Sequence, residues 1–154
     1  MGPTAQNKVA LVTGAGKPRV GNVIARTLAA RAYSVALHYN RSADYAQRTA
    51  RELEKEGGRA RAFQTDLAKP VEVDRLLEQT IEHFGRVDVL VTSAAIWEPK
   101  PLESVTAQDL RRHFDINALG TFLCCRKAGL IMVGQPEGGG NHHDRRLGYR
   151  PPLS

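Results

Sequence analysis

The sequence predicts an α/β fold with a doubly wound parallel sheet that stops after its fourth strand and the long helix that follows. Three observations lead to this prediction. Short apolar runs alternate along the chain with segments whose apolar residues recur at helical spacing. A glycine-containing turn joins the first run to the first helical segment. The alternation of strand and helix is typical of a parallel sheet that helices cover on both faces.

The expected elements can be placed in chain order. They are a strand over 8–12, a helix through 20–28, a strand over 34–38, a helix over 43–56, a strand over 59–63, a helix over 70–84, a strand over 87–91 and a long helix over 107–130. Ser42 is placed to cap the second helix, Pro70 suits the first turn of the third, and Gly85 ends it. Thr106 and Asp109 have the spacing of a capping box at the start of the last helix.

Composition and charge narrow the class of protein. The chain has 154 residues, 42% of them hydrophobic and 25% charged, which suits one soluble domain. The net charge is +6, but three arginines against one acid fall in the last fourteen residues, so a nucleic-acid partner is not expected. No apolar stretch suggests a signal peptide or a membrane partner, and we expect a cytoplasmic location. Cys124 and Cys125 are adjacent, a spacing that favours no disulfide and no metal site.

The first strand-to-helix turn, residues 13–21, carries the strongest chemical signal. Glycines there allow a pyrophosphate to approach the backbone N–H groups at the start of a helix. The second strand ends in a segment, residues 38–42, that contains no acid to bind a ribose 2′-hydroxyl. It contains Arg41 and Ser42 instead, which favour the 2′-phosphate of NADP(H) over NAD(H). The alternative is a solvent-exposed arginine beside a helix cap.

At these residues the chain resembles the short-chain dehydrogenase/reductase family, whose domain is a Rossmann-type fold. The resemblance covers roughly residues 8–133. The family's Thr-Gly-x-x-x-Gly-x-Gly turn is one residue longer here, with Gly14 and Gly21 at its ends and Arg19 in place of the middle glycine. Arg19 together with Leu-His-Tyr-x-Arg-Ser after the second strand is similar to the pteridine reductase branch. The resemblance implies an NADPH-dependent reductase of carbonyl or pteridine-like substrates.

Three further motifs follow in family order. Asp66 matches the residue beside the adenine, and Thr92-Ser93-Ala94-Ala95 stands where the family has Asn-Asn-Ala-Gly, so both asparagines and the glycine are replaced. Asn117 matches the Asn of the catalytic tetrad, which supports a water in the proton relay. Of the family's catalytic set, only Asn117 is present in this sequence, and we expect no metal site. The expected cofactor contacts are Gly14, Lys17, Arg19, Val20, Gly21, Asn40, Arg41, Ser42, Asp66, Leu67, Ser93, Ala94 and Ala95.

The residues that perform the family's chemistry are missing from the sequence. A Ser after a fifth strand and a Tyr-x-x-x-Lys motif are needed to orient the carbonyl and to transfer a proton. None of the four tyrosines has a lysine four residues later, and no lysine follows Lys127. We therefore expect this chain to be truncated and inactive, although its family is enzymatic. The alternative function is a non-catalytic nucleotide-binding fragment.

The end of the chain suggests a cause. We divide the sequence into an incomplete NADP(H)-binding domain, residues 1–140, and an aberrant, disordered tail, residues 141–154. Codons for Asn141-His142-His143-Asp144 all carry A in the second position and a pyrimidine in the third. Reading one base later gives Ile, Thr or Met four times, which restores a β-branched strand. A frameshift near Gly140 follows as a hypothesis that the coding nucleotides would test.

A sheet that stops at its fourth strand would leave strand 87–91 as an apolar edge with no neighbouring strand to cover it. We expect aggregation or partial disorder as a consequence. The long helix after Thr106 resembles the one that such enzymes use to pair subunits, so the resemblance implies a homo-oligomeric parent, a dimer or a tetramer.

Overall fold

The computed structural model describes residues 7–136. Its strands and helices are β1 (Val9–Thr13), α1 (Val20–Ala29), β2 (Ser34–Tyr39), α2 (Ala43–Lys55), β3 (Ala60–Gln64), α3 (Pro70–Phe84), β4 (Val89–Thr92), the 3-10 turn η1 (Leu102–Ser104), α4 (Ala107–Phe114), the π-helical turn η2 (Asp115–Gly120) and α5 (Thr121–Gly134). Every strand and helix expected from the sequence is present, with ends that differ by at most two residues, except that the last helix continues to Gly134 instead of ending at 130 and includes the π-helical turn η2. The tail of residues 141–154, and the frameshift hypothesis with it, lies outside the described residues.

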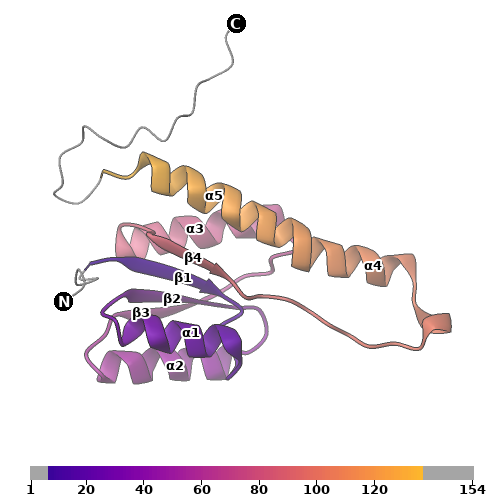
Figure 1. The fold of residues 1–154 in the computed structure, drawn as a ribbon, viewed down its shortest axis with the longest axis horizontal. Coiled ribbons are helices and arrows are strands. Elements are labelled where there is room, and N and C mark those ends of the chain that lie inside the picture. The colour runs from indigo at the N-terminus through magenta and orange to yellow at the C-terminus, as the bar shows by residue number, and fades with distance from the viewer. Residues whose placement is uncertain (1–6, 137–154) are drawn as a thin grey trace, which may run out of the picture.

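The four strands form one parallel sheet in the order β3-β2-β1-β4. In Figure 1, α1 and α2 cover one face of this sheet, and α3 and α5 lie over the other. The predicted α/β fold with a doubly wound parallel sheet is therefore confirmed. Since all the strands run in the same direction, their carboxyl ends meet at one edge, and loops that follow the strands gather there.

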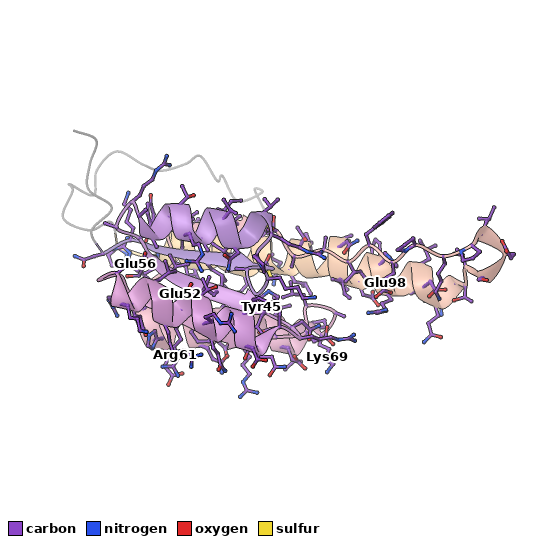
Figure 2. The ribbon with its side chains drawn as sticks, turned by 90° about the horizontal axis from the view of Figure 1, so that it is seen from below. Tyr45, Glu52, Glu56, Arg61, Lys69 and Glu98 are labelled. Carbon is purple, nitrogen blue, oxygen red and sulfur yellow. The ribbon has the colours of Figure 1, made fainter. Side chains whose placement is uncertain are left out.

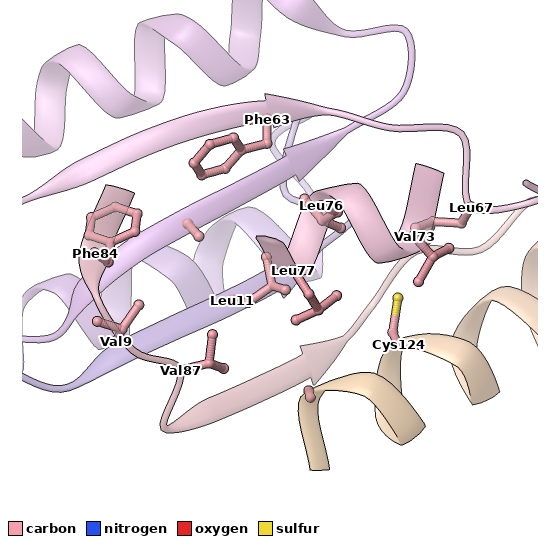
Figure 3. Packing of buried hydrophobic residues seen from close by; sticks show 12 residues of the cluster. Val9, Leu11, Phe63, Leu67, Val73, Leu76, Leu77, Phe84, Val87 and Cys124 are labelled. Atoms are coloured by element: carbon pink, nitrogen blue, oxygen red, sulfur yellow. The ribbon is translucent and has the colours of Figure 1, made fainter. Parts of the chain in front are cut away.

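Two apolar clusters hold the layers together. The larger one joins the sheet to α3 and α5, and in Figure 3 Cys124 of α5 points toward Val73 and Leu77 of α3. The smaller one joins the opposite face to α1 and α2 through Val12, Leu37, Ala25 and Leu53 among others. Burial of both faces explains why the first two strands are apolar at consecutive positions, over Val9–Val12 and Val35–Leu37, rather than at alternate ones.

Two local expectations need correction: that Val20 and Val23, at helical spacing, lie on the apolar face of the first helix, and that Ser42 caps the second. Val20 and Val23 are 68% and 61% exposed, whereas Gly21 and Ala25 face the sheet, because only small side chains fit where α1 lies closest to the strands. Ser42 is the N-terminal cap residue of α2 by position, but its side chain makes no capping hydrogen bond. The box of Thr106 and Asp109 is confirmed, with both reciprocal hydrogen bonds present.

The chain from Ala107 to Gly134 is helical without a break and extends beyond the sheet (Figure 1). Figure 2 shows Glu98, in the loop before this helix, beside the part of the helix that extends beyond the sheet. The helix, of 28 residues, contains an 18-residue window with a mean hydropathy of 1.4, of which 17% is buried. Length and composition would therefore allow it to cross a membrane, but a single helix that meets these two criteria is weak support for such a span.

Candidate cofactor-binding site

Two glycines make the turn between β1 and α1 possible. Gly14 has a φ of +68°, and a Cβ on it would lie 2.7 Å from the Cα of Ala94. A Cβ on Gly21 would lie 2.8 Å from the carbonyl oxygen of Gly14. The turn after β1, the start of α1 and the loop after β4 are therefore in backbone contact. This close approach brings together Gly14, Gly21 and Ala94, three of the predicted cofactor contacts, whose contact with a cofactor stays a prediction.

A third glycine of the same turn was not among the predicted contacts. A Cβ on Gly16 would lie 2.5 Å from the Oγ of Ser42 and 2.6 Å from the Cβ of Tyr39. Gly16 thus allows the turn to pack on the end of β2, beside Arg41 and Ser42. The repetition of glycine at 14 and 16 was the signal for it in the sequence.

Thr13 ties the turn to the loop after β4. Its hydroxyl oxygen accepts hydrogen bonds from the N–H groups of Ser93 and Ala94, both at 3.1 Å, and its O–H donates to the carbonyl of Val91 at 3.4 Å. The small residues that replace the family's asparagines and glycine therefore lie at the carboxyl edge of the sheet. Their backbone, rather than a side-chain amide, is what they contribute here.

A buried polar group links the turn to α2. The Nδ2 of Asn22 donates to the carbonyl of Ala15 and to the hydroxyl of Thr49, both at 3.0 Å. Arg26 donates to the Oδ1 of Asn22 and forms an ion pair with Glu52. Buried amides are usually fully hydrogen-bonded, and this one is. Asn22 was not among the predicted contacts, because its partner on α2, Thr49, is distant in the chain.

The solvent side of the turn is basic. Lys17 and Arg19 in the turn and Arg41 after β2 are exposed, and none of them forms an ion pair within residues 7–136. Helix α1 starts after Arg19 with no side-chain cap and no acid in its first turn. Its first N–H groups lack intrahelical acceptors, as at the start of any helix, and the positive end of the helix dipole directly follows Lys17 and Arg19 in the chain.

The loop after β3 forms a second side of the candidate cofactor-binding site. The carboxylate of Asp66 accepts a hydrogen bond from the N–H of Ala68 at 3.1 Å, and a cavity of about 410 Å³ lies between Asp66, Asn40 and the start of α3. Leu67 is buried in the larger apolar cluster, so its side chain serves the core. Hydrogen bonding to Glu72 raises the pKa of the Lys69 ammonium at the same cavity.

Asn117 belongs to neither the turn after β1 nor the loop after β3. It lies in η2, between α4 and α5. Its Oδ1 accepts from the N–H of Ile96 at 2.8 Å, and its Nδ2 donates to the carbonyl of Ile96 at 2.9 Å. The side chain thus anchors the loop after β4 to the long helix. π-Helical turns occur often at functional sites, because they displace backbone carbonyls from the regular hydrogen-bond pattern. The predicted role of Asn117 in a proton relay stays a prediction.

The chain is similar in sequence to known proteins over most of its length. A model of the short chain dehydrogenase family matches residues 8–139. The chain is 40% identical over 121 residues to the hydroxynaphthalene reductase-like protein Arp2 of Metarhizium majus, a match that covers 79% of this chain and 45% of that protein. It is 37% identical over 135 residues to the 3-oxoacyl-[acyl-carrier-protein] reductase of a Synechocystis strain, covering 88% of this chain and 53% of that protein.

Solved structures agree with the sequence comparisons. A short chain dehydrogenase from Burkholderia cenocepacia in complex with NADP superposes with a TM-score of 0.80 at 34% identity, over 84% of this chain and 53% of that one. A blue fluorescent protein from a metagenomic library, in complex with NADPH, gives 0.79 at 39% identity over the same shares. The chain therefore spans about half the length of the relatives it matches.

Proposed function

The chain belongs to the short-chain dehydrogenase family, and from this membership we propose that residues 8–133 form an NADP(H)-binding unit. The supporting observation is the basic surface at the turn between β1 and α1. Lys17, Arg19 and Arg41 are exposed there without ion-pair partners in the described part of the chain. Residues 38–42, at the end of β2, contain no carboxylate to compete for them.

The residues present fit a dinucleotide diphosphate. The N–H groups in the first turn of α1 provide donors for the pyrophosphate, and the glycines at 14, 16 and 21 let the turn pack closely enough to present them. Arg41 and Ser42 follow β2, where a 2′-phosphate on the adenosine ribose would meet a cation and a hydroxyl. The Asp66 carboxylate would accept a hydrogen bond from the adenine amine. Two similar solved structures contain NADP or NADPH, which supports this choice of cofactor.

For an enzyme of this family that also contains the missing Ser and Tyr-x-x-x-Lys, we propose hydride transfer between NADPH and a carbonyl substrate. The nicotinamide would supply the hydride, and the relatives named as a 3-oxoacyl reductase and a hydroxynaphthalene reductase-like protein support a carbonyl compound. A pteridine-like substrate stays a prediction from Arg19 and residues 37–42. The 154 residues lack the Ser and the Tyr-x-x-x-Lys, so we propose that this chain binds the cofactor without turning it over.

Titration of the 154-residue chain with NADPH and with NADH, followed by nicotinamide fluorescence, tests the cofactor proposal. We expect NADPH to bind about tenfold or more tightly than NADH, because a charge-assisted hydrogen bond contributes roughly 1.5–3 kcal/mol. The variant Arg41→Ala should remove most of that preference. Arg31→Ala is the matched control, because Arg31 is exposed at the opposite end of α1. Equal or tighter binding of NADH to the wild type would overturn the proposal.

A further inference from the structure

His38 lies between two turns that are expected to bind the cofactor. The turn after β1 is expected to hold the pyrophosphate, and the turn after β3 is expected to hold the adenine. The side chain is 2% exposed at the end of β2. Its Nδ1 accepts a hydrogen bond from the N–H of Gly14 at 3.1 Å, and its Nε2 lies 3.0 Å from the carbonyl oxygen of Thr65. A carbonyl can only accept, so the ring carries its proton on Nε2 and presents a lone pair to Gly14.

The backbone explains why an imidazole is needed there. The regular pairing of β1 with β2 ends at Val12 and Leu37, and the chain then turns away at Gly14, which has a positive φ. The N–H of Ala15 still bonds to the carbonyl of His38 at 3.0 Å. The N–H of Gly14 has no strand partner, and a buried N–H without an acceptor is costly. The imidazole supplies the acceptor.

We propose that His38 is a positioning residue for the dinucleotide: its neutral imidazole fixes the Gly14 peptide, and with it the phosphate turn, relative to the Thr65–Asp66 turn. The inference rests on the proposed function and deepens it, because it assigns a role in cofactor binding to a side chain that need not touch the cofactor. One ring contacts both turns, so their separation is set by a rigid group rather than by two independent loops.

The protonation state of His38 agrees with this role. Burial lowers the pKa of the imidazole, while the hydrogen bond to Thr65 and the negative charge of Asp66 act in the opposite direction and are smaller. The neutral acceptor form therefore persists at neutral pH. A second proton on Nδ1 would turn the acceptor into a donor facing the Gly14 N–H. Asp66 is the charged side chain that acts on the ring within residues 7–136.

The competing explanation is that His38 only fills space in the core. The two nitrogens can be separated by substitution, because the Oδ1 of Asn corresponds to Nδ1 and the amide of Gln reaches the position of Nε2. His38→Asn keeps an acceptor for Gly14 and loses the contact with Thr65. His38→Gln keeps the contact with Thr65 and loses the acceptor. His83→Gln, at an exposed histidine of α3, is the control.

The test uses the 154-residue chain and two readouts at pH 7.5. The first is the chemical shift and hydrogen-exchange rate of the Gly14 amide without ligand, and the second is the Kd for NADPH. We expect His38→Gln to deprotect the Gly14 amide and to weaken NADPH binding about tenfold, the factor that corresponds to the net contribution of one hydrogen bond. His38→Asn should keep the amide protected and the Kd within about threefold of the wild type.

Three results would overturn the proposal: equal effects of the two variants on both readouts, an unchanged Gly14 amide in His38→Gln, or loss of the fold in both variants together. Failure of the proposed function looks different. In that case the wild-type chain binds no NADPH, while the Gly14 amide still distinguishes the Gln variant from the Asn variant. The amide readout alone then decides whether His38 fixes the turn.

Discussion

The side-chain amide of Gln135 makes two hydrogen bonds with the backbone of Val87. Its Oε1 accepts from the Val87 N–H at 2.7 Å, and its Nε2 donates to the Val87 carbonyl at 2.8 Å. The next residue, Asp88, bonds to β1 through its N–H, so Val87 presents its polar groups to the opposite, open side of β4. The end of α5 thus covers the first position of an edge that has no neighbouring strand in the described part of the chain.

Replacing Gln135 with Ala should lower the free energy of unfolding by about 1–3 kcal/mol, because it leaves a buried N–H and a buried carbonyl without partners. Urea denaturation followed by circular dichroism measures this. Gln47→Ala is the control, because Gln47 is exposed on α2 and its loss should change stability by less than about 0.5 kcal/mol. Equal midpoints for both variants would show that the Gln135 contact contributes nothing.

Gly16→Ala should lower the free energy of unfolding by about 1–3 kcal/mol, because Tyr39 or the turn must move to admit the new methyl group. Gly129 provides a matched control on α5, where a Cβ would meet nothing within 4 Å. Gly129→Ala should stabilise the chain by up to about 1 kcal/mol, since alanine has the higher helix propensity. Thermal unfolding of the two variants should shift in opposite directions, and a shared direction would contradict the steric argument.

Local sequence signals predicted those elements whose ends are marked by a residue with a particular backbone preference, such as proline or glycine. Helix α3 runs from Pro70 to Phe84 with Gly85 in the left-handed conformation, as proline at the first turn and glycine after the last one indicate. The strand expected over 87–91 begins only at Val89, because Val87 is apolar like the strand but pairs with the side chain of Gln135 instead of another strand. Apolarity alone does not distinguish these two cases.

The candidate site was predictable where the backbone needs glycine and less so where side chains meet across elements. Gly14 and Gly21 were found from their spacing, and the structure brings them against Ala94. Asn22 belongs to no motif that the sequence pointed to, and His38 entered only as part of the motif of residues 37–42, without a role of its own. Their partners, on α2 and in the loop after β3, become adjacent only when the sheet forms. Pairwise contacts of this kind depend on tertiary structure, which no local window contains.

The two adjacent cysteines should differ sharply in reactivity. Cys124 is buried and Cys125 exposed, and burial is the main cause that raises the pKa of the Cys124 thiol to about 11. Only about a thousandth of such a thiol is ionised at pH 8, and the thiolate is the nucleophile. Iodoacetamide at pH 8 should therefore modify Cys125 and spare Cys124, as fragment-ion mass spectrometry would show. Modification of both at similar rates in the folded chain, rather than only in denaturant, would refute this assignment.

The ion pair of Arg26 with Glu52 should make stability depend on pH on the acid side. A hydrogen bond from Arg26 is the main cause that lowers the pKa of the Glu52 carboxyl below its ordinary value of 4.5. A carboxyl whose pKa is lower in the folded state contributes stability above pH 4.5, and this contribution is lost as the pH falls through the folded-state pKa. Glu52→Gln should therefore be less stable than the wild type at pH 7, and the difference should shrink as the pH falls below the ordinary carboxyl pKa of 4.5. Urea unfolding at a series of pH values measures this difference, and high salt should reduce it because both side chains are partly exposed.

Glu54→Gln is the control, because Glu54 is an exposed carboxylate without an ion pair in residues 7–136. Its free energy of unfolding should differ from that of the wild type by the same amount at every pH. A difference between wild type and Glu52→Gln that stayed constant with pH would assign the effect to packing of the side chain on α2 rather than to its charge.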